Sequence, residues 1–235
     1  MSGRIKRMAA PYRWPVKRKE SYWAAKPSPG PHSLEYSMPL ISVVRDMLSL
    51  VGLAKEGRKL IAQGSFSVDG KVRNDPNYPV GLMDVLTVKG EEGGFRMLID
   101  RRNRLHLVPV GKEEVSWKLC RVQGRHMMSG GRKQLTFHDG RTLISDIDAR
   151  TGDVVRLEIP AQRVSEVYRL APGSKALITG GSHVGQLATV KTFEKWRNPA
   201  PNLVHFEEGF STIWTNVFVS GATSSLIRPP EVSAI

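Results

Sequence analysis

The stretch from Glu56 to Val72 constrains the fold of this chain more than any other. A helix-compatible segment ends at Gly64, Phe66 and Val68 then alternate with polar residues, and Asp69-Gly70 follows directly. Glycine just after a helix favours the left-handed backbone that ends it. Asp-Gly next to alternating apolar residues is a strong signal for a two-residue β-hairpin turn. The sequence therefore predicts a short helix followed by a tight hairpin.

Two helices are predicted in this region. Apolar residues recur at steps of three and four over residues 39–51, which is typical of an amphipathic helix that ends near Gly52. A second helix is predicted from about Leu53 to Gln63, with Leu53, Gly57, Leu60 and Ile61 on one side. The opposite side carries a basic ridge formed by Lys55, Arg58 and Lys59. A strand from Met83 to Val88 is expected to complete this small module.

The charge of the chain indicates a polyanionic partner. The formal net charge is +13, and the first 33 residues alone hold eight Lys or Arg and one Glu. Nucleic acid and an acidic membrane surface both fit such a balance. The same 33 residues contain five prolines, so we expect an extended arm whose cations neutralise phosphates and whose aromatic rings stack on bases. The alternative is a solubilising tail whose aromatic residues pack on the folded part of the chain.

Cysteine usage and hydropathy limit the compartment. Cys120 is the only cysteine, and the six histidines are not spaced as metal ligands, so we expect a reducing environment, no structural metal and no cofactor. Cys120 itself is expected to act as a small apolar filler. Neither a signal peptide nor a run of eighteen apolar residues is evident, which predicts a soluble, intracellular protein.

The rest of the chain is expected to be β structure. Between residues 93 and 170, alternating segments separated by turn residues predict strands, including one through Val115, Trp117 and Leu119, and together a small barrel or curled sheet. The loop over residues 123–133 contains glycines and is basic. Its cations are equally expected to contact phosphate or to be simply solvated.

The segment from Gly173 to Lys191 places a glycine-rich loop between two short apolar strands. It fits neither the P-loop pattern nor the dinucleotide-binding pattern, and its flanks do not predict a strand-loop-helix unit. The segment resembles the KOW motif of ribosomal and transcription-elongation proteins, from which it departs at Ala188, where glycine is usual, so a slightly different turn after Gly185 is expected.

Gly64 to Val72, preceded by two helices, resembles the S4 RNA-binding domain, which occurs in ribosomal proteins, pseudouridine synthases and some tRNA synthetases. An enzyme is the main alternative that this resemblance raises. Residues 147–152 superficially resemble the turn that carries the catalytic aspartate of pseudouridine synthases, with Asp148 in its place. Too little chain follows Val88 for such a catalytic domain, so Asp148 is better interpreted as a turn residue.

From end to end the chain resembles the S4e family of small-subunit ribosomal proteins of archaea and eukaryotes, and its compactness is more typical of the archaeal members. The motifs that carry the resemblance are residues 5–14, 30–34, 39–40, 69–73, 78–79, 83–85, 118–120 and 179–181, Gly185, and residues 216–221. The resemblance implies a non-catalytic structural protein of the small ribosomal subunit in the cytoplasm. Its expected partners are small-subunit ribosomal RNA and neighbouring small-subunit proteins, with no membrane and no small-molecule substrate. A free RNA-binding regulator or assembly chaperone remains an alternative.

The predicted architecture is α+β and mainly β. It comprises a basic N-terminal arm (1–38), an S4-type RNA-binding domain (39–90), a central β-barrel-like domain (91–170), a KOW-like, SH3-like β domain (171–221) and a tail (222–235). Residues expected to contact RNA are basic side chains, one aromatic residue of the arm and three positions of the glycine-rich loop: Arg4, Lys6, Arg7, Arg13, Trp14, Lys17, Arg18, Lys19, Lys55, Arg58, Lys59, Lys71, Arg73, Arg125, Arg132, Lys133, Gly181, His183 and Gly185.

Overall fold

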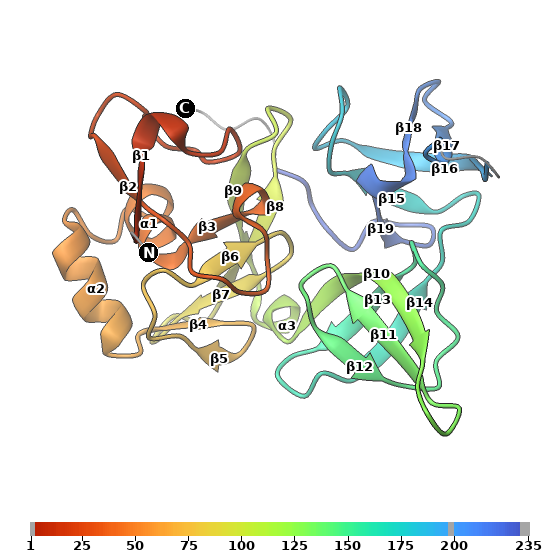
Figure 1. The fold of residues 1–235 in the computed structure, drawn as a ribbon, viewed down its shortest axis with the longest axis horizontal. Helices are drawn as coiled ribbons and strands as arrows, with labels where there is room; N and C mark the ends of the chain where they lie inside the picture. The colour runs from red at the N-terminus through yellow and green to blue at the C-terminus, as the bar shows by residue number, and fades with distance from the viewer. Residues whose placement is uncertain (1–2, 197–199, 231–235) are drawn as a thin grey trace. The chain divides into compact units, whose positions relative to one another are not determined.

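The computed structural model describes residues 3–196 and 200–230, so the ends of the predicted arm and tail, residues 1–2 and 231–235, lie outside the described residues. The chain forms two compact units (Figure 1). Unit 1 comprises residues 1–98, 104–118 and 159–161, and unit 2 comprises residues 99–103, 119–158 and 162–235. Antiparallel sheets dominate the described residues, as the prediction of a mainly β chain requires.

The first part of the chain contains the helices. Its elements are β1 (Arg4–Lys6), β2 (Trp23–Ala25), β3 (Ser37–Pro39), α1 (Leu40–Ser42) with a π-helical continuation (Val43–Met47), α2 (Ala54–Ala62), β4 (Phe66–Val68), β5 (Lys71–Val72), β6 (Pro79–Gly81), β7 (Val85–Val88), β8 (Gly94–Ile99), β9 (Leu105–Val110) and α3 (Lys112–Val115). One sheet has the strand order β5-β4-β7-β8-β9. The sheet thus runs on past residue 90, where a domain boundary was predicted, into β8 and β9.

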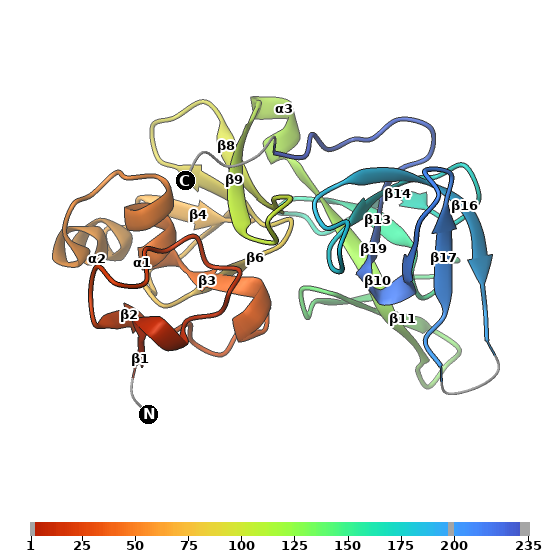
Figure 2. The same ribbon diagram turned by 90° about the horizontal axis from the view of Figure 1, so that it is seen from above.

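The second part consists of two five-stranded sheets. Its strands are β10 (Trp117–Met127), β11 (Lys133–Phe137), β12 (Thr142–Ile144), β13 (Val154–Glu158), β14 (Val164–Tyr168), β15 (Lys175–Ile178), β16 (Leu187–Glu194), β17 (Leu203–Phe206), β18 (Ser211–Ile213) and β19 (Val217–Gly221). The strand orders are β12-β11-β10-β13-β14 and β18-β17-β16-β15-β19. Strands β16 and β17 run side by side in Figure 2, in the antiparallel register that pairs Val190 with Phe206.

The helix and hairpin predicted around Gly64 are confirmed. Helix α2 begins after Leu53, whose N–H donates to the Glu56 side chain at 3.3 Å, and Gly64 has the expected positive φ of 74°. Asp69 and Gly70 have φ values of 51° and 71°, as a two-residue turn requires. Figure 1 shows the resulting strands β4 and β5 beside β7.

Three predicted elements differ from the structure. The helix expected over residues 39–51 ends at Met47, because the chain turns at Ser49 with a φ of 54° rather than at Gly52. Met83 has a φ of 69°, so β7 begins at Val85 instead of Met83. Val115 closes helix α3, and β10 starts only at Trp117. In each case the apolar periodicity of the sequence extends across a point at which the backbone changes direction, so the helix ends earlier and the two strands begin later than predicted.

The prediction of an extended arm is wrong for the described residues from Gly3 onward. β1 and β2 form an antiparallel pair, with Ile5 opposite Ala24. The side chain of Trp14 is buried, and its Nε1 donates to the carbonyl of Ser37 at 2.7 Å. A single large aromatic residue with its N–H satisfied can anchor a segment that has no apolar periodicity. The alternative of docked aromatic rings is therefore partly right, since Trp14 docks whereas Trp23 stays 48% exposed.

Candidate nucleic-acid interface

The basic ridge lies on the exposed side of α2. Lys55, Arg58 and Lys59 are exposed, whereas Gly57 and Ile61 on the opposite side are buried. A Cβ at Gly57 would come within 2.6 Å of the Ile41 side chain, so glycine here lets α2 pack closely against α1. One member of the predicted apolar side is misplaced, because Leu53 is 63% exposed at the helix start. The ridge thus offers three cations on a well-packed helix.

The hairpin after α2 adds two further cations. Lys71 is exposed at the start of β5, directly after the Asp69-Gly70 turn. Arg73 is half-buried, and the Cζ atom of its guanidinium lies 4.3 Å from the centroid of the Tyr78 ring. A guanidinium held over a ring keeps its charge and loses conformational freedom. Lys71 is the freer of the two side chains to follow a phosphate.

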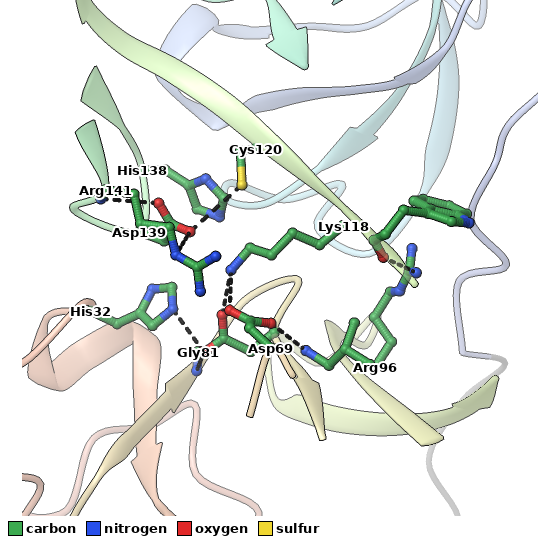
Figure 3. Close-up of polar contacts among 12 residues, drawn as sticks. His32, Asp69, Gly81, Arg96, Lys118, Cys120, His138, Asp139 and Arg141 are labelled. Atoms are coloured by element: carbon green, nitrogen blue, oxygen red, sulfur yellow. Dashed lines mark hydrogen bonds and ion pairs between the residues drawn. The ribbon is translucent and has the colours of Figure 1, made fainter. Parts of the chain in front are cut away.

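A buried polar cluster underlies this hairpin, and no local sequence pattern indicates it. The Nζ of Lys118 lies 2.8 Å from an Asp69 carboxylate oxygen and 2.7 Å from one of Asp84, with all three side chains at most 3% exposed. The Nε2 of His32 lies 2.9 Å from the other Asp84 oxygen, which also accepts the N–H of Gly81 at 2.9 Å. Figure 3 shows the Lys118 side chain extended toward Asp69, with His32 and Gly81 nearby. We call these residues (His32, Asp69, Gly81, Asp84, Lys118) the Lys118 cluster.

The electrostatics of the Lys118 cluster keep Asp84 ionised. Burial raises the pKa of the Asp84 carboxyl, but His32, Lys118 and the hydrogen bonds from His32 and Gly81 outweigh it and hold the pKa well below its usual range. The ionised form of Asp84 is therefore preferentially stabilised in the folded state.

This shift predicts a specific acid sensitivity. A folded-state pKa below the unfolded one adds stability at neutral pH, and that stability is lost as the pH falls through and below about 4. We expect Asp84→Asn to be less stable than the unmodified protein at neutral pH, and the difference between them to narrow toward acid. Urea unfolding as a function of pH measures both. The exposed carboxylate variant Asp146→Asn serves as control, and an Asp84→Asn deficit that does not change with pH would contradict the assignment.

The basic residues of the N-terminal segment divide by burial. Arg4, Lys6, Lys17 and Lys19 are exposed, and Arg13 and Arg18 are partly so. Arg7 is buried, and its guanidinium donates to the Lys17 carbonyl at 2.7 Å and to the Ser21 hydroxyl at 3.0 Å. Arg7 and Trp14, both predicted to contact RNA, thus serve the fold of the segment in this conformation. The exposed cations stay candidates for phosphate contact.

The loop predicted over residues 123–133 is shorter in the structure, because β10 continues to Met127 and β11 begins at Lys133, so of the three predicted cations here only Arg132 lies in the loop. Arg125 and Arg132 are exposed, and Lys133 begins β11. Arg125 lies 3.5 Å from Asp148, whose side chain is 58% exposed and also lies 3.8 Å from Arg169. Asp148 is therefore an exposed, ion-paired residue, which agrees with its interpretation as a turn residue better than with the buried setting of a catalytic carboxylate.

The glycine-rich loop between β15 and β16 has a partly internal role. Gly181 is exposed with a φ of 90°, but Gly185 is buried with a φ of 76°, and a Cβ there would lie 2.5 Å from the carbonyl of Asp100. The His183 ring stacks on Phe210 with centroids 4.0 Å apart. Of the three predicted positions, Gly181 is thus exposed, while Gly185 permits close packing within unit 2. Ala188, where the sequence departs from the KOW pattern, lies inside β16 opposite Ala176.

A second polar cluster, in unit 2, was also missed. Potential metal-ligand atoms of Cys120, His138 and Asp139 lie within 4.8 Å of one another. Other groups of the chain already contact these atoms. The Arg121 N–H donates to Nδ1 of His138 at 3.2 Å. Arg141 lies 3.2 Å from Asp139, and the Cys120 thiol donates to Asp139 at 3.6 Å (Figure 3). A guanidinium against the carboxylate disfavours a second cation there. Cys120 is thus more than the apolar filler expected.

Comparison with known proteins identifies the family. Residues 1–35 match the RS4NT (NUC023) domain, residues 48–86 the S4 domain and residues 92–164 the ribosomal family S4e. The chain is 41% identical to the small ribosomal subunit protein eS4 of Methanothermobacter thermautotrophicus over 230 residues, which cover 96% of this chain and 95% of that relative. The chain belongs to the S4e family of ribosomal proteins. This is a non-enzymatic family, so the pseudouridine synthase alternative is set aside.

Further S4e proteins are similar to this chain in sequence and in structure. The small ribosomal subunit protein eS4 of Picrophilus torridus is 38% identical over 235 residues, with all of both chains covered. The crystal structure of the 30S ribosomal protein S4e from Thermoplasma acidophilum matches with a TM-score of 0.72 and 38% identity, covering 80% of this chain and 96% of that one. These relatives are archaeal proteins. Within the part of the chain that the structure describes, no helix is both long and apolar enough to span a membrane.

Proposed function

We propose that this S4e-family chain is a structural constituent of the small ribosomal subunit that binds and stabilises small-subunit ribosomal RNA. The observation that carries the proposal is the match over nearly the full length to proteins named as small ribosomal subunit proteins. The exposed ridge on α2 and the adjoining Lys71, both within or next to the matched S4 domain, supply the cations that such a role requires. Neighbouring small-subunit proteins are the further partners.

The proposed contacts are mainly with phosphates and sugars. The ridge residues Lys55, Arg58 and Lys59 are flexible cations on a rigid helix, a combination suited to tracking an RNA backbone by shape rather than reading base edges. The exposed cations of the N-terminal segment and of the β10–β11 loop would extend this contact. We also propose a barrel-like central domain over residues 91–170 and a KOW-like domain over residues 171–221. In the KOW-like domain, the exposed Gly181 would approach RNA.

A charge-removal series tests the RNA-binding surface. Replacing Lys55, Arg58 and Lys59 together by glutamine should weaken binding to a small-subunit rRNA fragment and reduce the slope of log affinity against log salt by about two to three units, because each phosphate contact contributes about 0.7–0.9. Filter binding across a salt series measures both quantities.

The matched control removes the same charge elsewhere. Lys89, Lys112 and Arg163 are exposed cations outside the proposed contact set, and their triple replacement by glutamine changes net charge equally. Equal losses in the two triple variants would show that net charge, and not the ridge, determines affinity. Sedimentation of lysate adds a second criterion: the protein should remain with small subunits after a high-salt wash, whereas a free regulator or assembly chaperone would be released.

A further inference from the structure

The turn of the β4–β5 hairpin is held from inside by the Lys118 cluster. Asp69, the first central residue of that turn, directs its side chain into the protein, where one oxygen accepts the Val85 N–H at 3.0 Å and the other meets Lys118 at 2.8 Å. The backbone N–H of Asp69 also donates to the Val85 carbonyl at 2.9 Å. One residue of the turn is thus fixed by three contacts.

Lys118 connects this turn to segments that are remote in sequence. Its ammonium also meets Asp84, which follows β6, and Asp84 in turn holds His32 of the N-terminal segment. The separations along the chain are 49 residues between Lys118 and Asp69 and 52 between Asp84 and His32. Each of these buried side chains has a charged or hydrogen-bonded partner. If Asp69 moved away, the buried ammonium of Lys118 would lose one of the two carboxylates that compensate its charge. The turn therefore cannot shift independently of the cluster.

Besides the Asp69 contacts, the Arg73 N–H donates to the Phe66 carbonyl at 3.1 Å, and Gly70 lies against Ile159 and Pro160. Only two residue pairs link the strands, Ser67 with Val72 and Val68 with Lys71, and β5 is the edge strand of its sheet. Both residues of β5 are exposed, so no apolar side chain of β5 anchors it in the core. A two-stranded ladder of this length is marginal alone in water. The turn that Asp69 anchors directly precedes Lys71, so it is one of a small number of restraints on where Lys71 points.

We propose that Lys118, acting through Asp69, is a positioning residue for RNA binding: it fixes the β4–β5 turn so that Lys71 meets the RNA backbone in one defined geometry. The inference rests on the proposed RNA-binding function and deepens it. Lys118 itself touches no RNA, because its side chain is fully buried. Buried ion pairs are weak evidence for net stability, and fixing one conformation is a separate role that they can serve.

A double-mutant cycle on RNA affinity tests the proposal. The variants are Asp69→Asn, which keeps an acceptor for the Val85 N–H and removes the charge facing Lys118, Lys71→Gln, and the two combined, each in the full chain at a temperature where circular dichroism shows it folded. The probe is the same small-subunit rRNA fragment. We expect Asp69→Asn alone to weaken binding roughly fivefold, and to have little further effect once Lys71 is replaced, since residues that act together are non-additive.

Two controls separate positioning from stability. Val44→Ala creates a cavity at a buried position of the helix after α1 and should lower stability without changing affinity in the folded protein. Amide exchange of Arg73, whose N–H donates to the Phe66 carbonyl across the hairpin, should accelerate in Asp69→Asn but not in Val44→Ala. If Asp69→Asn fails to fold, Lys118→Arg, which keeps a cation but displaces it, takes its place in the cycle.

The outcomes are distinguishable. Additive effects of the two substitutions, or unchanged affinity in folded Asp69→Asn, would overturn the positioning role while leaving RNA binding intact. Failure of the unmodified protein to bind the fragment would overturn the proposed function, and the positioning role with it. A non-additive loss together with faster exchange of Arg73 would support the inference.

Discussion

Lys118→Met should lower the free energy of unfolding by about 3–5 kcal/mol, the range observed when one partner of a buried ion pair is removed. The cause is not the lost attraction alone. Asp69 and Asp84 would remain ionisable at buried positions without the ammonium that compensates them, and each would have to take up a proton or rearrange. Methionine keeps the length and apolar stem of lysine, so the substitution creates little cavity.

Urea denaturation followed by tryptophan fluorescence measures this loss, because Trp14 and Trp117 are both buried in unit 1. The control is Lys112→Met, an exposed lysine of α3, for which the change should stay within about 0.5 kcal/mol. A Lys118→Met loss below about 1 kcal/mol, comparable to an ordinary surface hydrogen bond, would show that the cluster tolerates an apolar replacement and that the two carboxylates find other partners.

Trp14→Ala should lower the free energy of unfolding by a similar amount, about 3–5 kcal/mol, as is typical when a buried tryptophan is truncated. The indole is 2% exposed and lies far along the chain from Ser37, whose carbonyl it engages. Its removal takes away the apolar anchor of a segment that otherwise contains many prolines and cations. We therefore expect the N-terminal segment to become sensitive to limited proteolysis even where the rest of unit 1 stays folded.

Two control variants test whether burial and the hydrogen bond of Trp14 cause this loss of stability. Trp23→Ala removes the same ring from a position that is 48% exposed, and its effect should be much smaller. Trp14→Phe keeps most of the apolar contact but leaves the Ser37 carbonyl without its donor, which should cost about 1–3 kcal/mol. Similar losses in Trp14→Ala and Trp23→Ala would mean that the segment is not anchored by its buried tryptophan.

The parts of the fold that follow from local signals were predictable. Gly64 and Asp69-Gly70 set the backbone directly, and the alternation of Lys55, Arg58 and Lys59 with Gly57 and Ile61 gave the exposed ridge of α2. The turn at Ser49 was not predictable, since serine has no particular preference for positive φ and the apolar periodicity continues past it.

The features that could not be predicted depend on contacts between residues far apart in sequence. Nothing near Lys118 distinguishes it from a surface lysine, because the carboxylates that make its burial tolerable are 34 and 49 residues away. Arg7 was misassigned for the same reason: its partners become visible only when the N-terminal segment folds back on itself. Net charge indicated a polyanionic partner without saying which cations would meet it, and burial decides which of them are exposed.

The environment of Cys120 has a practical consequence for the experiments proposed above. The thiol is fully buried among apolar residues of unit 2, and it donates to the Asp139 carboxylate at 3.6 Å. Thiol-reactive dyes should therefore spare it in the native protein and label it only on unfolding. A cysteine introduced at an exposed position such as Lys112 could then carry a fluorophore at a single site, without first removing the native cysteine.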